Sequence, residues 1–417
     1  MKHSFAILVS LVVFFNIAGK NGRAVAQTVP TPVTVNTLLN STHPLPILAW
    51  SGLPPSLSTV ERFKEVREAG FTHHLQVYGT MEVLQKVLDA AGQADVKIFT
   101  NAIGPLAEFV PRVKNHPAFA GYLVGVFDEP GVGSFDDLAK EVKAVQALDT
   151  EHWCYINLLP TYGFKSIEIY RDYVTSFLAK VPVKVLSFDH YPIFQDYAVT
   201  RIRPDFYENL ETIRQSAQKA KLPFWAFALS TGHWGYPIAT LPHLRFQVYS
   251  NLAYGAQGIQ YFTYWTLTSP GVDFNNGPLD QNAKRTVVYD RVKLVNQEIQ
   301  ALAGVFLGSK VVSVSHTGET IPAGTTRYQL KPPFRNLTTT GPGAVVAELE
   351  KGQHRFLVVV NRDIEKPMTL TLAQRSGTKL VEIQKNGTLS PIAADPARYE
   401  IEPGDVKIVM WSAPYSN

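Results

Sequence analysis

The sequence predicts a (β/α)₈ barrel followed by an all-β domain, and three observations lead to this prediction. From Ile47 to about Leu302, short apolar or β-branched runs alternate with amphipathic stretches of helical spacing. There are eight such runs, which is the strand number of a closed parallel barrel. After Gly304 the pattern changes to alternating strands separated by turn sequences, with no convincing helix.

The eight runs are typical of buried parallel strands, because each is short, apolar or β-branched and bounded by turn residues. A doubly wound open sheet uses the same units, but no glycine-rich phosphate loop follows the first run, and eight units favour the barrel. The expected strands are Ile47–Trp50, His74–Tyr78, Val96–Asn101, Tyr122–Asp128, Trp153–Leu158, Val185–Asp189, Phe224–Leu229 and Ile259–Trp265.

Helices are expected between these strands, where apolar residues recur at a spacing of three or four. Thr59 is placed to begin the first helix, and Gly70 to close it. Ser134 is placed to cap a helix over residues 135–148, and Asp205 helps to open another over residues 207–217. The last helix of the barrel is expected from about Thr286, at residues 286–302.

Residues 47–304 are therefore assigned to the barrel and residues 305–417 to a β-sandwich. Turn sequences such as Lys385-Asn386-Gly387 separate the sandwich strands. The expected strands are Val311–Ser315, Thr326–Leu330, Ala344–Glu348, Phe356–Asn361, Met368–Leu372, Leu380–Gln384 and Val406–Trp411.

The N-terminus has the pattern of a secretory signal peptide. Lys2 begins a positive start, Phe5 to Ala18 form an apolar run, and Ala24-Val25-Ala26 supplies the small residues of a cleavage site. A signal anchor is the alternative, but the apolar run is shorter than a spanning helix needs. We expect a signal peptide at residues 1–26, a linker at 27–46 and no membrane span after cleavage.

Composition fits an exported globular protein that does not bind nucleic acid. The formal net charge of +4 is small for 417 residues, and lysine and arginine form no run. Cys154 is the single cysteine, so an internal disulfide is excluded. The expected location is the periplasm or the extracellular space of a bacterium. The residues give no indication of an oligomeric state.

The ends of the predicted strands carry the candidate site residues, since the βα-loops of a barrel converge there. Polar side chains mixed with aromatic rings suit a carbohydrate, whose hydroxyls need directional partners and whose C–H faces stack on rings. Ordinary strand-end polarity is the alternative for any one of them. The candidates for substrate binding are Trp50, Tyr78, Asn101, Asp128, Asn157, His190, Tyr191, His233, Trp234, Tyr264 and Trp265.

The motif Asp128-Glu129-Pro130 ends the fourth predicted strand. It resembles the Asn-Glu-Pro of the large clan of glycoside hydrolases with (β/α)₈ barrels, which includes β-galactosidases and cellulases. The resemblance implies that Glu129 is a general acid/base and that the chain cleaves glycosidic bonds. A neighbouring carboxylate such as Asp128, with partial burial, would keep that acid protonated. A solvated loop that opens a helix is the other reading of the motif.

The clan places its second catalytic glutamate at the end of strand seven, where this sequence has no acid. The nearest substitute is Asp189, which ends strand six. A wide separation from Glu129 would suit an inverting mechanism in which Asp189 activates water. Alternatively, Asp189 caps a turn or orients His190. The resemblance also implies that Trp265, at the end of strand eight, is a platform for the sugar, whereas Phe262 fits the barrel core.

Two classes of function follow from these residues. The first is a glycoside hydrolase that uses Glu129 and Asp189, and the second is a carbohydrate-binding protein on a degenerate barrel, prompted by the missing strand-seven acid. A lyase or transglycosylase with the same acid is a further alternative. No metal or cofactor is expected, because His73-His74 lacks ligand spacing and no zinc, P-loop, nucleophile-elbow or dinucleotide motif is present. We expect Trp50, Trp234 and Trp265 to line one pocket.

The signal-peptide assignment makes a direct prediction. When the full chain is expressed in a bacterium, the exported protein should begin at or close to Gln27, because Ala24-Val25-Ala26 presents the small residues that signal peptidase accepts. N-terminal sequencing of the exported fraction measures this. A membrane-bound product that retains Met1 would show that the segment is an anchor.

Overall fold

The computed structural model describes residues 33–197 and 199–412. The expected signal peptide and its cleavage site at Gln27 lie outside the described residues, as does the start of the expected linker. Within the described residues, no helix combines the length and the apolar character that crossing a membrane requires.

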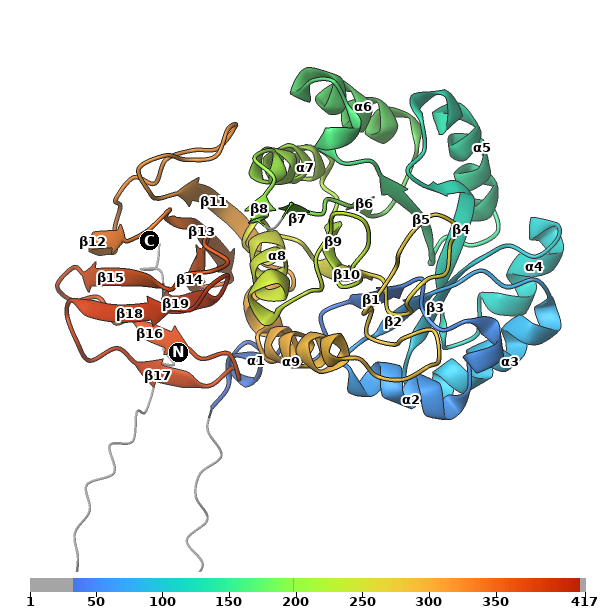
Figure 1. Cartoon of the computed structure of the whole chain (residues 1–417), viewed down its shortest axis with the longest axis horizontal. Coiled ribbons are helices and arrows are strands. Elements are labelled where there is room, and N and C mark those ends of the chain that lie inside the picture. Colours follow the sequence, from blue (N-terminus) through green and yellow to red (C-terminus); the bar gives the residue numbers. More distant parts are fainter. Residues whose placement is uncertain (1–32, 198, 413–417) are drawn as a thin grey trace, which may run out of the picture. The chain divides into compact units, whose positions relative to one another are not determined.

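Eight parallel strands form a closed barrel, so the predicted fold class is confirmed (Figure 1). Pairing of Ile47 with Ile259 closes the barrel between its first and last strands. The barrel strands are β1 (Ile47–Trp50), β2 (His73–Leu75), β3 (Lys97–Asn101), β4 (Phe119–Asp128), β5 (Trp153–Leu158), β6 (Leu186–Phe188), β9 (Phe224–Leu229) and β10 (Gly258–Phe262).

Helices follow the strands, and hydroxyl side chains cap several of them. The hydroxyls of Thr59, Thr80, Ser166, Thr240 and Thr286 each accept a backbone N–H of the first turn. The helices are α1 (Val35–Leu38), α2 (Val60–Glu68), α3 (Met81–Gln93), α4 (Leu106–Val113), α5 (Phe135–Gln146), α6 (Ile167–Lys180), α7 (Phe206–Ala220), α8 (Leu241–Ala253), α9 (Val287–Ala301) and α10 (Ala303–Phe306), with 3₁₀ turns at Pro55–Leu57, Val132–Ser134 and Thr161–Gly163.

Some local expectations were wrong. Ser134 does not cap α5, because its hydroxyl donates to the Gly131 carbonyl at 2.7 Å. The last barrel strand ends at Phe262, so Tyr264 and Trp265 follow it in a loop. The segment expected as a linker contains α1, which is tied to the end of the barrel by a hydrogen bond from the Asn36 side chain to the Gln300 carbonyl.

Apolar and aromatic side chains fill the barrel toward the N-terminal ends of its strands. Trp225 is 1% exposed and contacts the rings of Trp153 at 5.2 Å and His73 at 5.5 Å. Gly258 allows this packing, since a Cβ there would lie 2.5 Å from the Trp225 ring. The interior cluster comprises Leu48, Leu75, Phe99, Leu123, Tyr155, Val185 and Trp225. The barrel is therefore a packed core whose polar groups gather toward the other end.

Two antiparallel sheets make up the C-terminal domain. A six-stranded sheet has the order β11-β13-β14-β19-β16-β17, and a three-stranded sheet has the order β12-β15-β18. The strands are β11 (Lys310–His316), β12 (Phe334–Thr339), β13 (Ala344–Lys351), β14 (His354–Asn361), β15 (Met368–Gln374), β16 (Val381–Ile383), β17 (Leu389–Pro391), β18 (Ala397–Ile401) and β19 (Val406–Ser412). An apolar cluster with members from both sheets forms this domain's core.

The expected strand at Thr326–Leu330 is not formed. Only a single bridge pairs Arg327 with His316, and Pro332 and Pro333 follow shortly after. Proline has no backbone N–H to donate, so the pairing cannot extend through Pro332 and Pro333. Within the barrel, an unexpected hairpin of β7 (Ile193–Asp196) and β8 (Val199–Ile202) follows β6.

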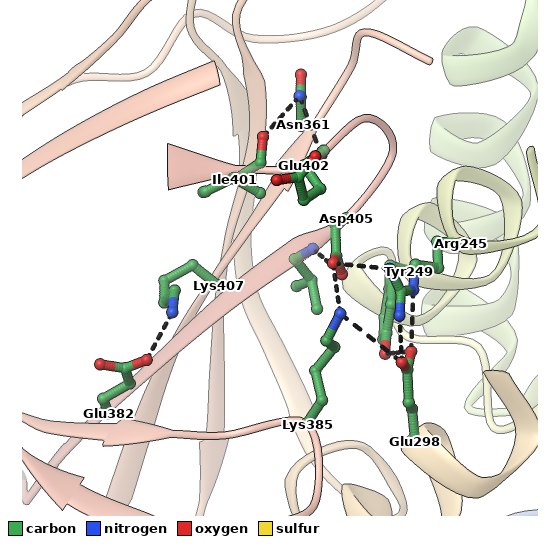
Figure 2. Close-up of polar contacts among 11 residues, drawn as sticks. Arg245, Tyr249, Glu298, Asn361, Glu382, Lys385, Ile401, Glu402, Asp405 and Lys407 are labelled. Carbon is green, nitrogen blue, oxygen red and sulfur yellow. Dashed lines mark hydrogen bonds and ion pairs between the residues drawn. The ribbon is translucent and has the colours of Figure 1, made fainter. Parts of the chain in front are cut away.

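A charged network joins α8 and α9 to the C-terminal domain (Figure 2). Arg245 on α8 pairs with Glu298 on α9 and, at 3.1 Å, with Asp405 just before β19. Lys385 contacts Asp405 at 2.5 Å, and the Tyr249 hydroxyl donates to Glu298 at 2.8 Å. The side chains of Arg245, Glu298 and Asp405 are at most 12% exposed. Each charge is therefore removed from water and depends on its partners.

We predict that Asp405→Ala lowers the free energy of unfolding by roughly 3 kcal/mol, since it removes a partner of the largely buried Arg245 and of the partly exposed Lys385. Urea unfolding followed by circular dichroism measures the change. Asp95→Ala is the matched control, because Asp95 pairs with Arg67 while its side chain is 80% exposed. Equal effects of the two substitutions would show that burial of the network does not matter.

Candidate active site

A cavity of about 190 Å³ lies at the C-terminal ends of the barrel strands. Its lining residues lie on six of the barrel strands or just after them, and most of these residues were expected from the sequence. Its lining consists of Trp50, Asp128, Glu129, Asn157, Asp189, Tyr191, Phe227 and Phe262. The structure thus brings both expected catalytic carboxyl groups, Glu129 and Asp189, to one cavity.

A bulge in β4 places the two adjacent acids. The pairing of β4 with β5 shifts between Leu123 and Asp128, so β4 contributes extra residues over this stretch. Gly125 takes a φ of +48° there, and a Cβ at that position would lie 2.8 Å from Glu141 on α5. Asp128 then returns to the ladder opposite Asn157.

Glu129 has a φ of +50°, which is unusual for a residue with a side chain. Its backbone N–H donates to the Asn157 carbonyl at 2.9 Å, which holds it in this conformation. Glu129 is exposed at the mouth of the cavity, whereas Asp189 is only 6% exposed. A strained backbone at such a position is a feature of functional sites.

The Asn157 amide links the other two carboxyl groups. Its Nδ2 donates to Asp189 Oδ1 at 3.2 Å and to Asp128 Oδ1 at 3.3 Å. Its Oδ1 accepts a hydrogen bond from the Ser187 hydroxyl at 2.8 Å. This last bond fixes which end of the amide faces the acids, because a flipped amide would place two acceptors against each other.

Buried polar groups extend this chain into the barrel. Gln260 donates to the Ser187 hydroxyl at 2.8 Å and accepts from the Tyr155 hydroxyl at 2.6 Å. Ser187, Gln260 and Tyr155 are each at most 1% exposed. Hydrogen bonds in a buried chain polarise one another, and such a chain specifies one arrangement. Sequence reasoning missed Ser187 and Gln260, although both lie on barrel strands whose neighbours are apolar.

The surroundings of Asp128, Glu129 and Asp189 raise the pKa of each carboxyl group. Burial is the largest cause that raises the pKa of Asp189 well above its ordinary value, and the nearby charges of Glu129 and Asp128 act in the same direction. Burial followed by the charge of Asp128 raises the pKa of Glu129. Burial also raises the pKa of Asp128, against the hydrogen bond from Asn157. Burial and the neighbouring charges therefore both oppose the simultaneous ionisation of all three groups.

Aromatic rings form the remaining wall of the cavity. Trp50 lies 5.3 Å from Phe262 and 6.2 Å from Phe227 between ring centroids, and Tyr191 contacts both phenylalanines. We expected Phe262 in the barrel core, but this residue lines the cavity. Phe227 was missed, yet alternation along β9 could have identified it, since Trp225, Phe227 and Leu229 all lie in the interior clusters.

Several expected substrate-binding residues do not line this cavity. Tyr78 is 1% exposed, and its backbone exchanges hydrogen bonds with the Asn101 side chain. His190 is buried and lies 3.3 Å from the Asp205 carboxylate. His233 directs Nδ1 to the Thr231 carbonyl at 3.0 Å. None of these four residues lines the cavity.

The three tryptophans that we expected in one pocket are separated. Trp50 lines the cavity, Trp265 packs against the main apolar core, and Trp234 is 68% exposed. Tyr264 is fully buried and packs on Phe71. The expectation of a shared pocket was therefore wrong, because the chain leaves the barrel after Phe262 and turns Tyr264 and Trp265 toward the core.

The end of strand seven is internally satisfied. Ser230 and Thr231 follow β9, and their hydroxyls donate to the Thr263 carbonyl at 3.0 Å and 3.2 Å. No carboxylate from this strand enters the cavity lining. Among the described residues, no group of histidine, cysteine, aspartate and glutamate side chains is arranged to hold a metal ion.

The buried state of Asp189 leads to a prediction about stability. Its folded-state pKa is raised, so the folded protein binds its proton more tightly than the unfolded chain, and folding is penalised once pH exceeds the ordinary aspartate value. Asp189→Asn removes this penalty and can still accept the Asn157 hydrogen bond. We expect it to raise the free energy of unfolding at pH 7 by about 1 kcal/mol or more.

The gain from Asp189→Asn should vanish at pH values below about 4, where the aspartate is protonated in both states. Denaturant unfolding at several pH values measures it. Asp196→Asn, on the exposed hairpin strand β7, is the control and should give no comparable gain. A loss of stability at neutral pH in Asp189→Asn would contradict the inferred cost of burying the Asp189 carboxyl.

Comparison with known proteins supports the fold. Neither models of protein families nor curated sequences give a match. A family 42 β-galactosidase from G. stearothermophilus matches with a TM-score of 0.60 and 9% identity, over 92% of this chain and 100% of that one. A family 5 glycoside hydrolase from Bacteroides vulgatus matches with a TM-score of 0.53 and 13% identity, over 89% of each chain.

A β-galactosidase from the psychrophilic Marinomonas ef1 matches with a TM-score of 0.46 and 13% identity, over 62% of this chain. This chain spans only 60% of that protein's length. At these identities the first two likenesses show the fold alone. The chain thus has the (β/α)₈-barrel fold found in these glycoside hydrolases, in agreement with the resemblance of its strand-four motif, Asp128-Glu129-Pro130.

Proposed function

We propose that this protein is a glycoside hydrolase that cleaves the glycosidic bonds of an oligo- or polysaccharide. The observation that carries the proposal is the cavity whose lining includes Glu129 and Asp189 together with aromatic rings. Two carboxyl groups are the usual requirement for hydrolysing a glycoside, and rings that stack on a pyranose are the usual means of holding one.

Glu129 is the proton donor in this proposal. It is the acid exposed at the mouth of the cavity, where it can reach the oxygen that links two sugars. Its raised pKa, caused by burial and by Asp128, increases the fraction that carries a proton. Donation of that proton lets the leaving sugar depart as an alcohol rather than as an alkoxide.

Asp189 is the base in this proposal, and it acts on a water molecule. As the glycosidic bond breaks, Asp189 takes a proton from the water, and the water oxygen bonds to the anomeric carbon. Glu129 loses a proton and Asp189 gains one, so the pair holds the same number of protons before and after the reaction. The starting state is restored when Asp189 releases its proton and Glu129, which is exposed, takes one up from solvent. Only the ionised form of Asp189 can act as the base, and the raised pKa makes this form a stronger base but a smaller fraction of the protein at a given pH.

A carbohydrate-binding protein without turnover is the second candidate. The observation that favours it is the end of β9, where hydroxyls bonded to the Thr263 carbonyl stand in place of the clan's second acid. Both candidates require the aromatic cavity, and only the hydrolase requires Glu129 to transfer a proton.

Export to the periplasm or extracellular space is part of the proposal and rests on the N-terminal residues alone. An enzyme that cleaves oligo- or polysaccharides has to reach them in the compartment that contains them. The signal-peptide pattern that ends at Ala26 is consistent with the periplasm or the extracellular space as that compartment.

The test of the proposal is the substitution Glu129→Gln. On a panel of unactivated β-linked oligosaccharides, the wild type should cleave at least one member, and Glu129→Gln should reduce kcat by about 100-fold or more, because glutamine cannot donate a proton to the leaving sugar. Reducing-end release and calorimetric binding are measured side by side. Binding should be retained, since the amide keeps the size and hydrogen-bonding capacity of the acid.

Glu141→Gln is the matched control for this test. Glu141 approaches the β4 bulge from α5 and does not line the cavity, so turnover should stay near the wild-type value. Unchanged turnover in Glu129→Gln would remove Glu129 from catalysis. Binding of sugars by a wild type that cleaves no panel member would favour the binding-protein candidate.

A further inference from the structure

Trp234 combines two unfavourable features. Its side chain is 68% exposed, so a large apolar surface faces water. Its backbone has a φ of +45°, in the left-handed region that bulky residues rarely adopt. Glycine is the residue type that tolerates this backbone region, but here it occupies the next position, Gly235. The exposed apolar surface and the left-handed backbone are both unfavourable at this position. We infer from them that the exposed indole ring has a function.

Two hydrogen bonds hold Trp234 in place. Its backbone N–H donates to Asp273 Oδ1 at 2.6 Å, and its indole Nε1 donates to the Gly271 carbonyl at 3.2 Å. The adjoining loop is paired as well, since Gly232 and Asn275 exchange backbone hydrogen bonds at 2.9 Å and 2.8 Å. The polar edge of the indole is therefore occupied, and what the side chain offers to a ligand is its ring surface.

The loop that carries Trp234 adjoins the catalytic cavity. The ring of His233 lies 5.6 Å from Phe262, which lines the cavity, and 5.9 Å from Trp234. Tyr236 lies 5.8 Å from Tyr191, another lining residue. Aromatic rings thus continue from the cavity wall to the exposed indole.

The size of the cavity limits what it can hold. A volume of about 190 Å³ is smaller than the roughly 300–1,000 Å³ of pockets that enclose a drug-sized ligand. An oligosaccharide therefore has to extend beyond the cavity, along a surface that can bind further sugar units.

We propose that Trp234 forms an outer sugar-binding subsite, in which the indole stacks on the apolar C–H face of a pyranose unit of a bound oligosaccharide. This inference rests on the proposed function for the position of the reacting bond, but the subsite itself requires only binding. The ligand class is an oligosaccharide of at least two units, with one unit at the cavity and another on Trp234. Pre-organisation of the ring lowers the entropy lost on binding.

Binding measurements by calorimetry test the proposal, with cello-, xylo-, manno- and galacto-oligosaccharides of one to six units as probes. The Glu129→Gln background prevents turnover. For the series that binds, affinity should rise with length, and Trp234→Ala should lower the affinity for the longer members by about 5- to 10-fold, the size of an aromatic stacking contribution. Affinity for the single sugar should not change.

Two further variants separate stacking from a change in the loop. Trp234→Phe retains a ring and should recover most of the affinity for longer members. Leu330→Ala, at an apolar residue of the C-terminal domain that is 52% exposed, should have no effect. The wild type and each variant are compared by thermal melting to confirm that they are folded.

The outcomes distinguish this inference from the proposed function. Length-dependent binding that requires Trp234, in a wild-type protein that cleaves nothing, keeps the subsite and rejects the hydrolase. The inference is overturned if Trp234→Ala leaves long-oligosaccharide binding unchanged, if Trp234→Phe binds no better than Trp234→Ala, or if single-sugar and long-chain affinity fall together. Absence of binding by every probe to the unsubstituted protein also overturns it.

Discussion

The hydrogen bonds of the Asn157 amide are the interaction on which the site depends. One donor nitrogen, on β5, faces two carboxyl groups, Asp128 and Asp189, from the strands on either side of β5. The amide keeps this orientation because its oxygen is engaged by Ser187, which is engaged in turn by Gln260. The positions of Asp128 and Asp189 are therefore set by hydrogen bonds from inside the barrel.

This arrangement has an electrostatic cost that the barrel has to offset. Three carboxyl groups border a small cavity, and burial opposes the ionisation of each. The apolar cluster around Trp225 below them and the shell of helices around the strands supply the burial that stabilises the fold. The strained backbone at Glu129 and the raised pKa of Asp189 both lower stability locally, at the candidate active site.

The two parts of the described chain are joined by charge as well as by apolar contact. Arg245 lies between an acid of its own barrel, Glu298, and an acid of the C-terminal domain, Asp405 (Figure 2). These three buried charges stabilise the fold only while all three residues are present, and their ion pairs hold the three side chains in one geometry. The C-terminal ends of the barrel strands, where the cavity lies, contain none of these groups, so the site and the joint are separate.

The alternation of short apolar runs with helical stretches was enough to predict the barrel. The strands of a closed parallel sheet are buried and therefore apolar, and the helices that cover them are amphipathic, so both leave a local pattern in the sequence. The sequence also determined that Asp128, Glu129, Asn157 and Asp189 end strands, and strand ends must converge. Only the tertiary structure decided which strand-end residues share a cavity. Trp265 and Tyr264 turn into the core because β10 ends at Phe262, and Trp234 is held outward by Gly271 and Asp273. The Ser187–Gln260 chain could not be read from the sequence, since it forms between residues 73 positions apart. Side-chain contacts of this kind depend on register and bulges, such as the one in β4, that local pattern does not encode.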